Sequence, residues 1–293
     1  MRTFCATVAF LLALCLGCAG PGAPEAAVNR AMAQEAATPE IAPVSESGGL
    51  AFSTPRPSQT EPPLVEVPEE SEEALPWTYP ISREILDDEQ DVLRLVNANN
   101  LLDKDYPGED MLVEVTVRKA NSNEMLARAV ASEALQAMFD AADEDGLKLY
   151  LYSAYRNYRS QEVIHYNRVE AMGYDDGLVQ VAGGSEHQTG LAFDVISYAW
   201  IGSRFNEDFA DTPEGQWMAE NCTRFGFIIR YPEGKQDITG IEYEPWHLRY
   251  VGVEVATYMT EKGLTLEEFT VEWRNAVFDY EMQSQQSMSI DSF

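Results

Sequence analysis

The chain is short of cysteine and of histidine. It has four cysteines and three histidines in 293 residues. Cys5, Cys15 and Cys18 all lie in the first eighteen residues, so Cys222 is the one cysteine of the remaining chain. A single cysteine excludes an intrachain disulfide and a multi-cysteine zinc site from that remainder. We expect Cys222 to be a packed helix residue and not a nucleophile.

Positive charge is also scarce. The chain has 20 Lys and Arg residues against 49 Asp and Glu residues, which gives a formal net charge of −29. Nucleic acids and anionic membrane surfaces are bound through basic patches, so this balance argues against both as partners. Long apolar runs are missing beyond the first twenty residues, and we therefore expect no membrane-spanning helix there.

Residues 1–18 have the composition of an export leader. One arginine precedes an apolar run that is too short to span a bilayer, and small residues follow it. This order is typical of secretory signal peptides. Cys18 resembles the lipidated cysteine of a lipoprotein leader, although Cys15 stands where an aliphatic residue is usual. We expect an exported, extracytoplasmic protein that is tethered to the membrane by a lipid on Cys18, with simple secretion as the alternative.

Composition divides the chain into four segments. The leader covers residues 1–18. Residues 19–76 are rich in Ala, Pro, Glu, Ser and Thr and contain one aromatic residue. Such a segment cannot bury enough apolar surface to offset the entropy lost on ordering, so we predict a disordered stalk. Residues 77–280 are predicted to form one folded domain, and residues 281–293 a polar, frayed tail.

The folded segment mixes helical and strand patterns. Apolar residues at helical spacing predict helices over residues 123–142, 160–172, 213–225 and 266–278. Short alternating or apolar runs predict strands over residues 92–97, 112–117, 147–153, 191–196, 227–231 and 246–250. Because these elements show no regular βαβ alternation, the pattern predicts an α+β fold with a small antiparallel sheet and flanking helices.

Two of the three histidines lie in short motifs that also contain carboxylates. The motifs are SEHQTGLAFD at residues 185–194 and EPWH at residues 244–247. We predict that His187, Asp194 and His247 bind one Zn²⁺ ion. Two imidazoles and one carboxylate leave a fourth position of zinc open, which distinguishes a catalytic site from a structural one.

The remaining residues of the two motifs suggest how such a site forms and works. His187 and Asp194 are seven positions apart, which fits one ligand on a loop, a tight turn at Gly190 and a second ligand on the following strand. Glu244 is a carboxylate beside the site that is free to handle the proton of a water molecule. The pattern therefore predicts a zinc hydrolase. His165 belongs to neither motif, and we expect it to be a surface or packing residue.

The two motifs resemble those of the VanY-type D-alanyl-D-alanine carboxypeptidases. These cell-wall zinc peptidases are related to VanX dipeptidases, lysostaphin-like endopeptidases and the hedgehog signalling domain. A third stretch, SAYR at residues 153–156 with Gln161 beyond it, resembles the family's Ser-x-Tyr-Arg element. Three motifs in the right order are more specific than any one of them. The resemblance covers the middle and later parts of the chain and implies a hedgehog-like catalytic domain.

The resemblance also implies roles for single residues. Glu244 would be the general base, with an ordinary salt bridge as the alternative. Arg156 would polarise the scissile carbonyl, with a structural ion pair as the alternative. Ser185 and Gln161 would contact the terminal D-alanine, and Trp246 would form a wall of the cleft or part of the core.

The implied function is removal of the terminal D-Ala from peptidoglycan stem peptides by a monomeric enzyme. The motifs identify the zinc ligands and the base, but they do not identify the subsites that bind the peptide. An L,D-carboxypeptidase, a D,D-dipeptidase and an endopeptidase on cell-wall peptides therefore remain alternatives. A non-catalytic wall-binding or signalling module on the same scaffold is the alternative from another class.

Overall fold

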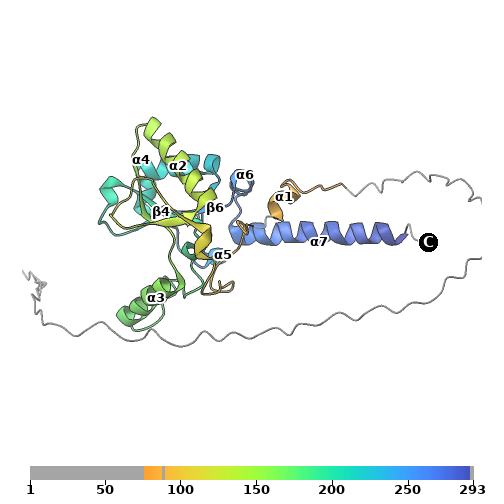
Figure 1. Cartoon of the computed structure of the whole chain (residues 1–293), viewed down its shortest axis with the longest axis horizontal. Helices are drawn as coiled ribbons and strands as arrows, with labels where there is room; N and C mark the ends of the chain where they lie inside the picture. The colour runs from red at the N-terminus through yellow and green to blue at the C-terminus, as the bar shows by residue number, and fades with distance from the viewer. Residues whose placement is uncertain (1–75, 88–89, 291–293) are drawn as a thin grey trace, which may run out of the picture. The chain divides into compact units, whose positions relative to one another are not determined.

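The computed structural model of the chain describes residues 76–87 and 90–290 (Figure 1). The expected leader, and the expected stalk up to residue 75, lie outside the described residues. All described residues belong to a unit that spans Glu69–Phe293. Among the described helices, none combines the length and the apolar character that crossing a membrane requires.

A four-stranded antiparallel sheet lies at the centre of this unit, in the strand order β3-β4-β6-β5. Its strands are β3 (Leu149–Ser153), β4 (Ala192–Ser197), β5 (Phe227–Ile229) and β6 (His247–Tyr250). A separate antiparallel pair consists of β1 (Leu112–Glu114) and β2 (Leu126–Arg128). The predicted α+β class with a small antiparallel sheet is confirmed.

Seven α-helices surround the strands in the described part of the chain. They are α1 (Arg83–Leu86), α2 (Ala129–Glu144), α3 (Tyr158–Met172), α4 (Pro213–Asn221), α5 (Gln236–Thr239), α6 (Val253–Lys262) and α7 (Leu266–Ile290). Short 3₁₀ helices add η1 (Glu109–Met111), η2 (Glu186–Thr189), η3 (Tyr198–Trp200), η4 (Glu207–Asp211) and η5 (Cys222–Phe225). The start of α3 is capped by Asn157, whose side chain accepts a hydrogen bond from the backbone of Ser160.

The larger core lies between the sheet and helices α2 and α4, which lie over β4 in Figure 1. All six residues of β4 are buried, because this strand is central in the sheet. Phe193 of β4 belongs to the same cluster as Leu135 and Met138 of α2 and Met218 of α4. Cys222 is buried in this cluster as a free thiol, and burial raises its pKa to about 12. The packing role expected for this residue agrees with that position.

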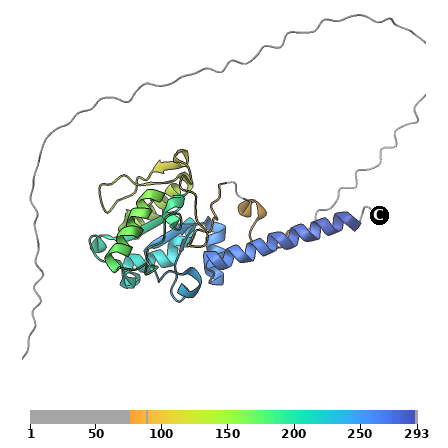
Figure 2. The same ribbon diagram turned by 90° about the horizontal axis from the view of Figure 1, so that it is seen from below.

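A smaller core attaches α6 and α7 to the sheet. Val255 and Met259 of α6 pack with Leu266 and Phe269 at the start of α7. Farther along α7, Tyr280 makes an edge contact with Trp77, with 5.3 Å between ring centroids. Both views show α1 beside α7 (Figure 2). The start of α7 is fixed near the sheet, because Leu266 and Phe269 pack in the same cluster as Ile228 of β5.

Three expected elements differ from the structure. Residues 92–97 form turns and an irregular segment in place of a strand. The carbonyls of Val92 and Arg94 accept hydrogen bonds from Arg249 and not from a neighbouring strand. The helix expected from residue 123 begins at Ala129, because residues 126–128 pair with β1. Residues 281–290 were expected to fray, yet α7 continues through them.

Candidate metal centre and its surroundings

The sheet places two of the predicted ligands side by side. Strands β4 and β6 are antiparallel neighbours, and their register puts Asp194 opposite His247. The third predicted ligand, His187, lies on η2, which immediately precedes β4. Gly190 ends η2 with a φ of 70°, and a Cβ atom there would lie 2.8 Å from a side-chain carbon of Leu112. A glycine at this turn lets the chain bring His187 back to Asp194.

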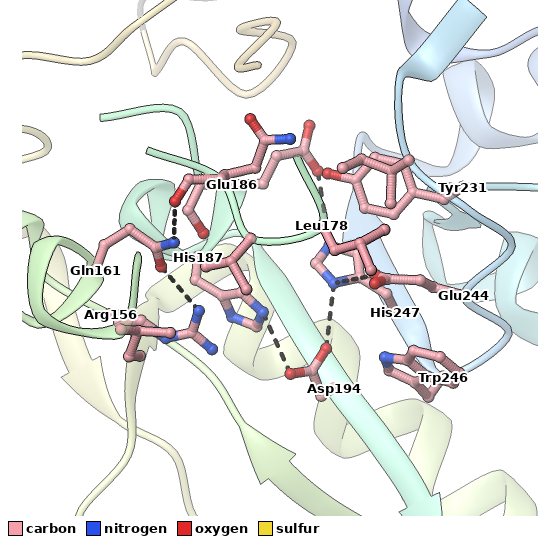
Figure 3. A pocket seen from close by; sticks show the side chains of 15 residues that line it. Arg156, Gln161, Leu178, Glu186, His187, Asp194, Tyr231, Glu244, Trp246 and His247 are labelled. Carbon is pink, nitrogen blue, oxygen red and sulfur yellow. Dashed lines mark hydrogen bonds and ion pairs between the residues drawn. The ribbon is translucent and has the colours of Figure 1, made fainter. Parts of the chain in front are cut away.

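The three side chains meet at one point (Figure 3). Nε2 of His187 lies 3.3 Å from Oδ2 of Asp194, and Nδ1 of His247 lies 3.1 Å from Oδ1 of the same carboxylate. One ligand atom from each residue lies within 4.8 Å of the others. Tetrahedral zinc with bonds of 2.0–2.2 Å brings its donors to roughly 3.3–3.5 Å from one another. Both nitrogen–oxygen distances, each to a different oxygen of Asp194, are close to this separation, so the three side chains could hold a zinc ion after a small adjustment.

The hydrogen bonds of His187 favour a cation at this point. Nδ1 of His187 lies 2.7 Å from the carbonyl oxygen of Ala154, which can only accept, so Nδ1 carries the proton. Burial lowers the pKa of His187 and favours its neutral form. Burial alone would raise the pKa of Asp194, but His187 and His247 hold it far below its usual range. A neutral Nε2 lone pair then faces an ionised carboxylate, and a metal ion between these two acceptors would satisfy both.

The charges around His247 lead to the same conclusion. Burial by itself lowers the pKa of His247, but its hydrogen bond with Asp194 and the nearby carboxylate of Glu186 outweigh this effect and raise it to about 9. Neighbouring carboxylates therefore favour a positive charge where His247 and Asp194 meet. A bound dication supplies that charge.

Glu244 lies beside this group without belonging to it. Its Oε2 is 3.6 Å from Nδ1 of His247. The side chain is 27% exposed and lines a cavity, and its backbone N–H donates to the carbonyl of Tyr231. Desolvation by the surrounding protein raises the pKa of Glu244 to about 7. A carboxylate with a pKa near neutrality can both accept and return a proton.

The predicted residues Arg156 and Gln161 lie together on the other side of His187. Nη1 of Arg156 donates to Oε1 of Gln161 at 2.9 Å, and Nη2 donates to Oγ of Ser153 at 3.2 Å. Gln161 in turn donates to the carbonyl of Gln180. Within the described residues, no ion pair joins Arg156 to a carboxylate. This arrangement argues against the alternative of a structural ion pair.

The three predicted ligands line one cavity of about 180 Å³ together with Glu244, Arg156 and Gln161. Ser185 and Trp246 contribute to its lining, and Trp246 also makes an edge contact with Phe205 at 5.2 Å between ring centroids. Ile164 of α3 and Leu178 add exposed apolar side chains to this lining. The helical pattern of residues 160–172 predicts Ile164 as a core position, and this prediction is wrong because the residue is 40% exposed. Neither residue belongs to a motif, so only the fold reveals them.

Two further lining residues were also missed, Glu186 and Tyr231. Glu186 lies inside the first motif, between Ser185 and His187, at a position that the pattern leaves open. Tyr231 follows a predicted strand, and burial raises the pKa of its hydroxyl far above the usual range. His165 lies on α3 with its Nε2 3.2 Å from Asp175 and outside the metal group, as expected.

Comparisons with known proteins point to one family. The family model VanY, described as D-alanyl-D-alanine carboxypeptidase, matches residues 124–253. A D-alanyl-D-alanine carboxypeptidase of Enterococcus faecalis is 37% identical over 70% of this chain and 73% of that protein. The bifunctional D-Ala-D-Ala dipeptidase and carboxypeptidase VanXYC of Enterococcus gallinarum is 33% identical over 60% of this chain and 92% of that protein. The solved structure of the LdcB LD-carboxypeptidase covers 62% of this chain and 86% of its own, at 42% identity and a TM-score of 0.58.

Proposed function

Because the chain belongs to the VanY family of D-alanyl-D-alanine carboxypeptidases, we propose that it removes the terminal D-Ala of peptidoglycan stem peptides in a zinc-dependent reaction. The observation that carries this proposal is the group of His187, Asp194 and His247, with Glu244 beside it in the same cavity. Hydrolysis at a metal site needs these components, namely three ligands, an accessible position and a nearby base. The relative from Enterococcus faecalis supports the substrate class.

The residues of the cavity have different roles in peptide hydrolysis. Zinc, when bound, supplies Lewis acidity that makes water a better nucleophile and a carbonyl a better electrophile. Glu244 accepts a proton from the attacking water and returns it to the amine nitrogen as the C–N bond breaks. Arg156 donates hydrogen bonds to the negative charge that develops on the carbonyl oxygen. Ser185 and Gln161 contact the terminal D-alanine, and Trp246 forms a wall beside it.

A second candidate is an L,D-carboxypeptidase that cleaves tetrapeptides. It is considered because the solved structure of the LdcB LD-carboxypeptidase is 42% identical to this chain. Both reactions would use the same metal ligands and the same base. The two reactions differ in the configuration of the residue before the cleaved bond. Testing one substrate of each kind therefore distinguishes them.

The purified protein is expected to remove one alanine from a muropeptide that ends in D-Ala-D-Ala, and to lose this activity when a chelator removes its zinc. Mass spectrometry of the muropeptide before and after incubation measures the loss. Re-addition of zinc should restore cleavage, which controls for inactivation by the chelator itself.

A tetrapeptide incubated in parallel separates the two candidates. If only the tetrapeptide is cleaved, the proposed D,D-carboxypeptidase activity is wrong and the protein is an L,D-carboxypeptidase. If neither peptide is cleaved by zinc-loaded protein, the proposed activity is wrong and a binding module becomes the better explanation.

We also propose that the protein acts as a monomer outside the cytoplasm, tethered by a lipid on Cys18. The leader pattern of residues 1–18 supports this location, as does a substrate that belongs to the cell wall. In a bacterial host, Cys18→Ser should move the protein from the membrane fraction to the soluble fraction, whereas the control Cys5→Ser, outside the pattern that precedes Cys18, should not. Membrane association that survives Cys18→Ser would contradict the proposed anchor.

A further inference from the structure

Glu186 is a fully buried carboxylate whose role the proposed reaction leaves open. One of its oxygens, Oε1, accepts two hydrogen bonds of 2.7 Å, from Nε of Arg230 and from Nη1 of Arg249. The side chains of all three residues have no exposed surface. A charge at such a position is tolerated only because it is paired.

The other oxygen of Glu186 faces the metal site. Neither Oε2 of Glu186 nor Nε2 of His247 has a hydrogen-bond partner among the described residues, and both atoms are buried. They lie 3.9 Å apart, as the dashed line between them in Figure 3 marks. Buried polar atoms are nearly always paired, and a ring N–H and a carboxylate oxygen are complementary. A movement of about 1 Å closes this gap to a hydrogen bond.

This pairing decides which nitrogen of His247 can bind a metal. If Nε2 carries the proton and donates it to Glu186, Nδ1 keeps its lone pair. Nδ1 is the nitrogen that lies 3.1 Å from Asp194. Metal-binding histidines commonly donate their second N–H to a carboxylate, which fixes both the tautomer and the ring orientation.

Glu186 is itself held in place by groups from distant parts of the chain. Arg230 makes two hydrogen bonds with Glu267 on α7, through Nη1 at 2.9 Å and Nη2 at 2.6 Å. Arg249 donates from Nη2 to the carbonyls of Val92 and Arg94. Two arginines thus balance two carboxylates. Glu267 and both carbonyls lie outside residues 124–253, the segment that the family model matches.

We propose that Glu186 is a positioning residue for the metal site, which accepts a hydrogen bond from Nε2 of His247 and thereby presents Nδ1 to the metal. Arg230 and Arg249 hold the carboxylate by hydrogen bonds to its other oxygen. Glu186 therefore affects how tightly the metal is bound without touching either metal or substrate. This inference rests on the metal site of the proposed function, but it does not depend on which peptide is cleaved.

Zinc affinity tests the proposal directly, by competition with a chromophoric chelator. Glu186→Gln keeps the shape of the side chain and one oxygen for the arginines, but turns an N–H₂ group toward His247. We expect this variant to bind zinc about 10- to 100-fold more weakly. The matched control is Glu267→Gln, which removes the same charge from the same network but does not face His247. It should change the affinity by no more than a few-fold.

Two results would overturn the proposal. An unchanged affinity in Glu186→Gln would show that the carboxylate does not position His247. An equal loss in both variants would show that charge balance, and not the contact with His247, is what matters.

Nitrogen NMR of the full-length, zinc-loaded protein gives a second test that needs no variant to fold. The chain has only three histidines, so three imidazole rings are observed. We expect His247 to carry its proton on Nε2 and to bind zinc through Nδ1. Zinc on Nε2 would overturn the proposal. Protein that binds no zinc would contradict both this inference and the proposed function, whereas zinc binding without peptide cleavage would contradict the activity alone.

Discussion

Replacing Glu244 with Gln is expected to slow peptide hydrolysis by about 10²- to 10⁴-fold while zinc stays bound. The amide keeps the size of the side chain but cannot accept a proton from water. Glu244 lies 3.6 Å from His247 in the cavity, outside the group of three ligand atoms. Its pKa of about 7, raised by desolvation, suits a group that must take up and release one proton in each cycle. The turnover number on a muropeptide ending in D-Ala-D-Ala measures the effect, and metal analysis measures the zinc.

Glu242 provides the matched control for this substitution. It is a carboxylate two positions away, but it is exposed and does not line the cavity. Glu242→Gln should therefore leave turnover unchanged. Hydrolysis that survives Glu244→Gln would remove the proposed role. Loss of zinc together with activity would show instead that Glu244 takes part in binding the metal.

The metal group could be predicted from the sequence because its geometry is largely local. His187 and Asp194 are brought together by one short helical turn, one glycine and the start of a strand. The turn, the glycine and the strand can each be recognised from residues that are adjacent in the sequence. His247 joins them through the pairing of β4 with β6, which two predicted strands of matching character made plausible. The structure brings together the residues that the motifs named.

The support around the metal group could not be predicted in the same way. Glu186 meets Arg230 and Arg249 across 44 and 63 residues of sequence. No periodicity or spacing connects residues so far apart, and each of the three alone looks like an ordinary surface charge. Their complete burial is a property of the folded chain, because only there do the opposite charges compensate each other.

The two misplaced elements near the start of the domain have a similar cause. Residues 92–97 are apolar enough for a strand, but two of their carbonyls are used by the buried Arg249 side chain. Residues 126–128 fit a helical pattern, but they pair with β1. In both cases a contact with a distant segment overrides a local preference. Tertiary contacts commonly decide short ambiguous segments of this kind.

Replacing Arg156 with Gln is expected to lower kcat/KM for the same muropeptide by about 10²- to 10³-fold, with zinc retained. The guanidinium lies beside His187, fixed by hydrogen bonds to Gln161 and Ser153 and free of any carboxylate partner in the described part of the chain. Its positive charge is therefore available to the carbonyl oxygen as that atom becomes negative. If this is its role, kcat and kcat/KM should fall together.

Arg159 is the matched control, because it lies three residues away with a side chain that is 79% exposed and paired with Glu162. Arg159→Gln should leave both kinetic constants unchanged. A rise in KM with an unchanged kcat in Arg156→Gln would contradict the expected role, since it would mean that Arg156 binds ground state and transition state equally. The terminal carboxylate of the peptide, which is charged in both states, would then be its partner. The split between KM and kcat therefore decides which end of the substrate lies against Arg156 in the cavity.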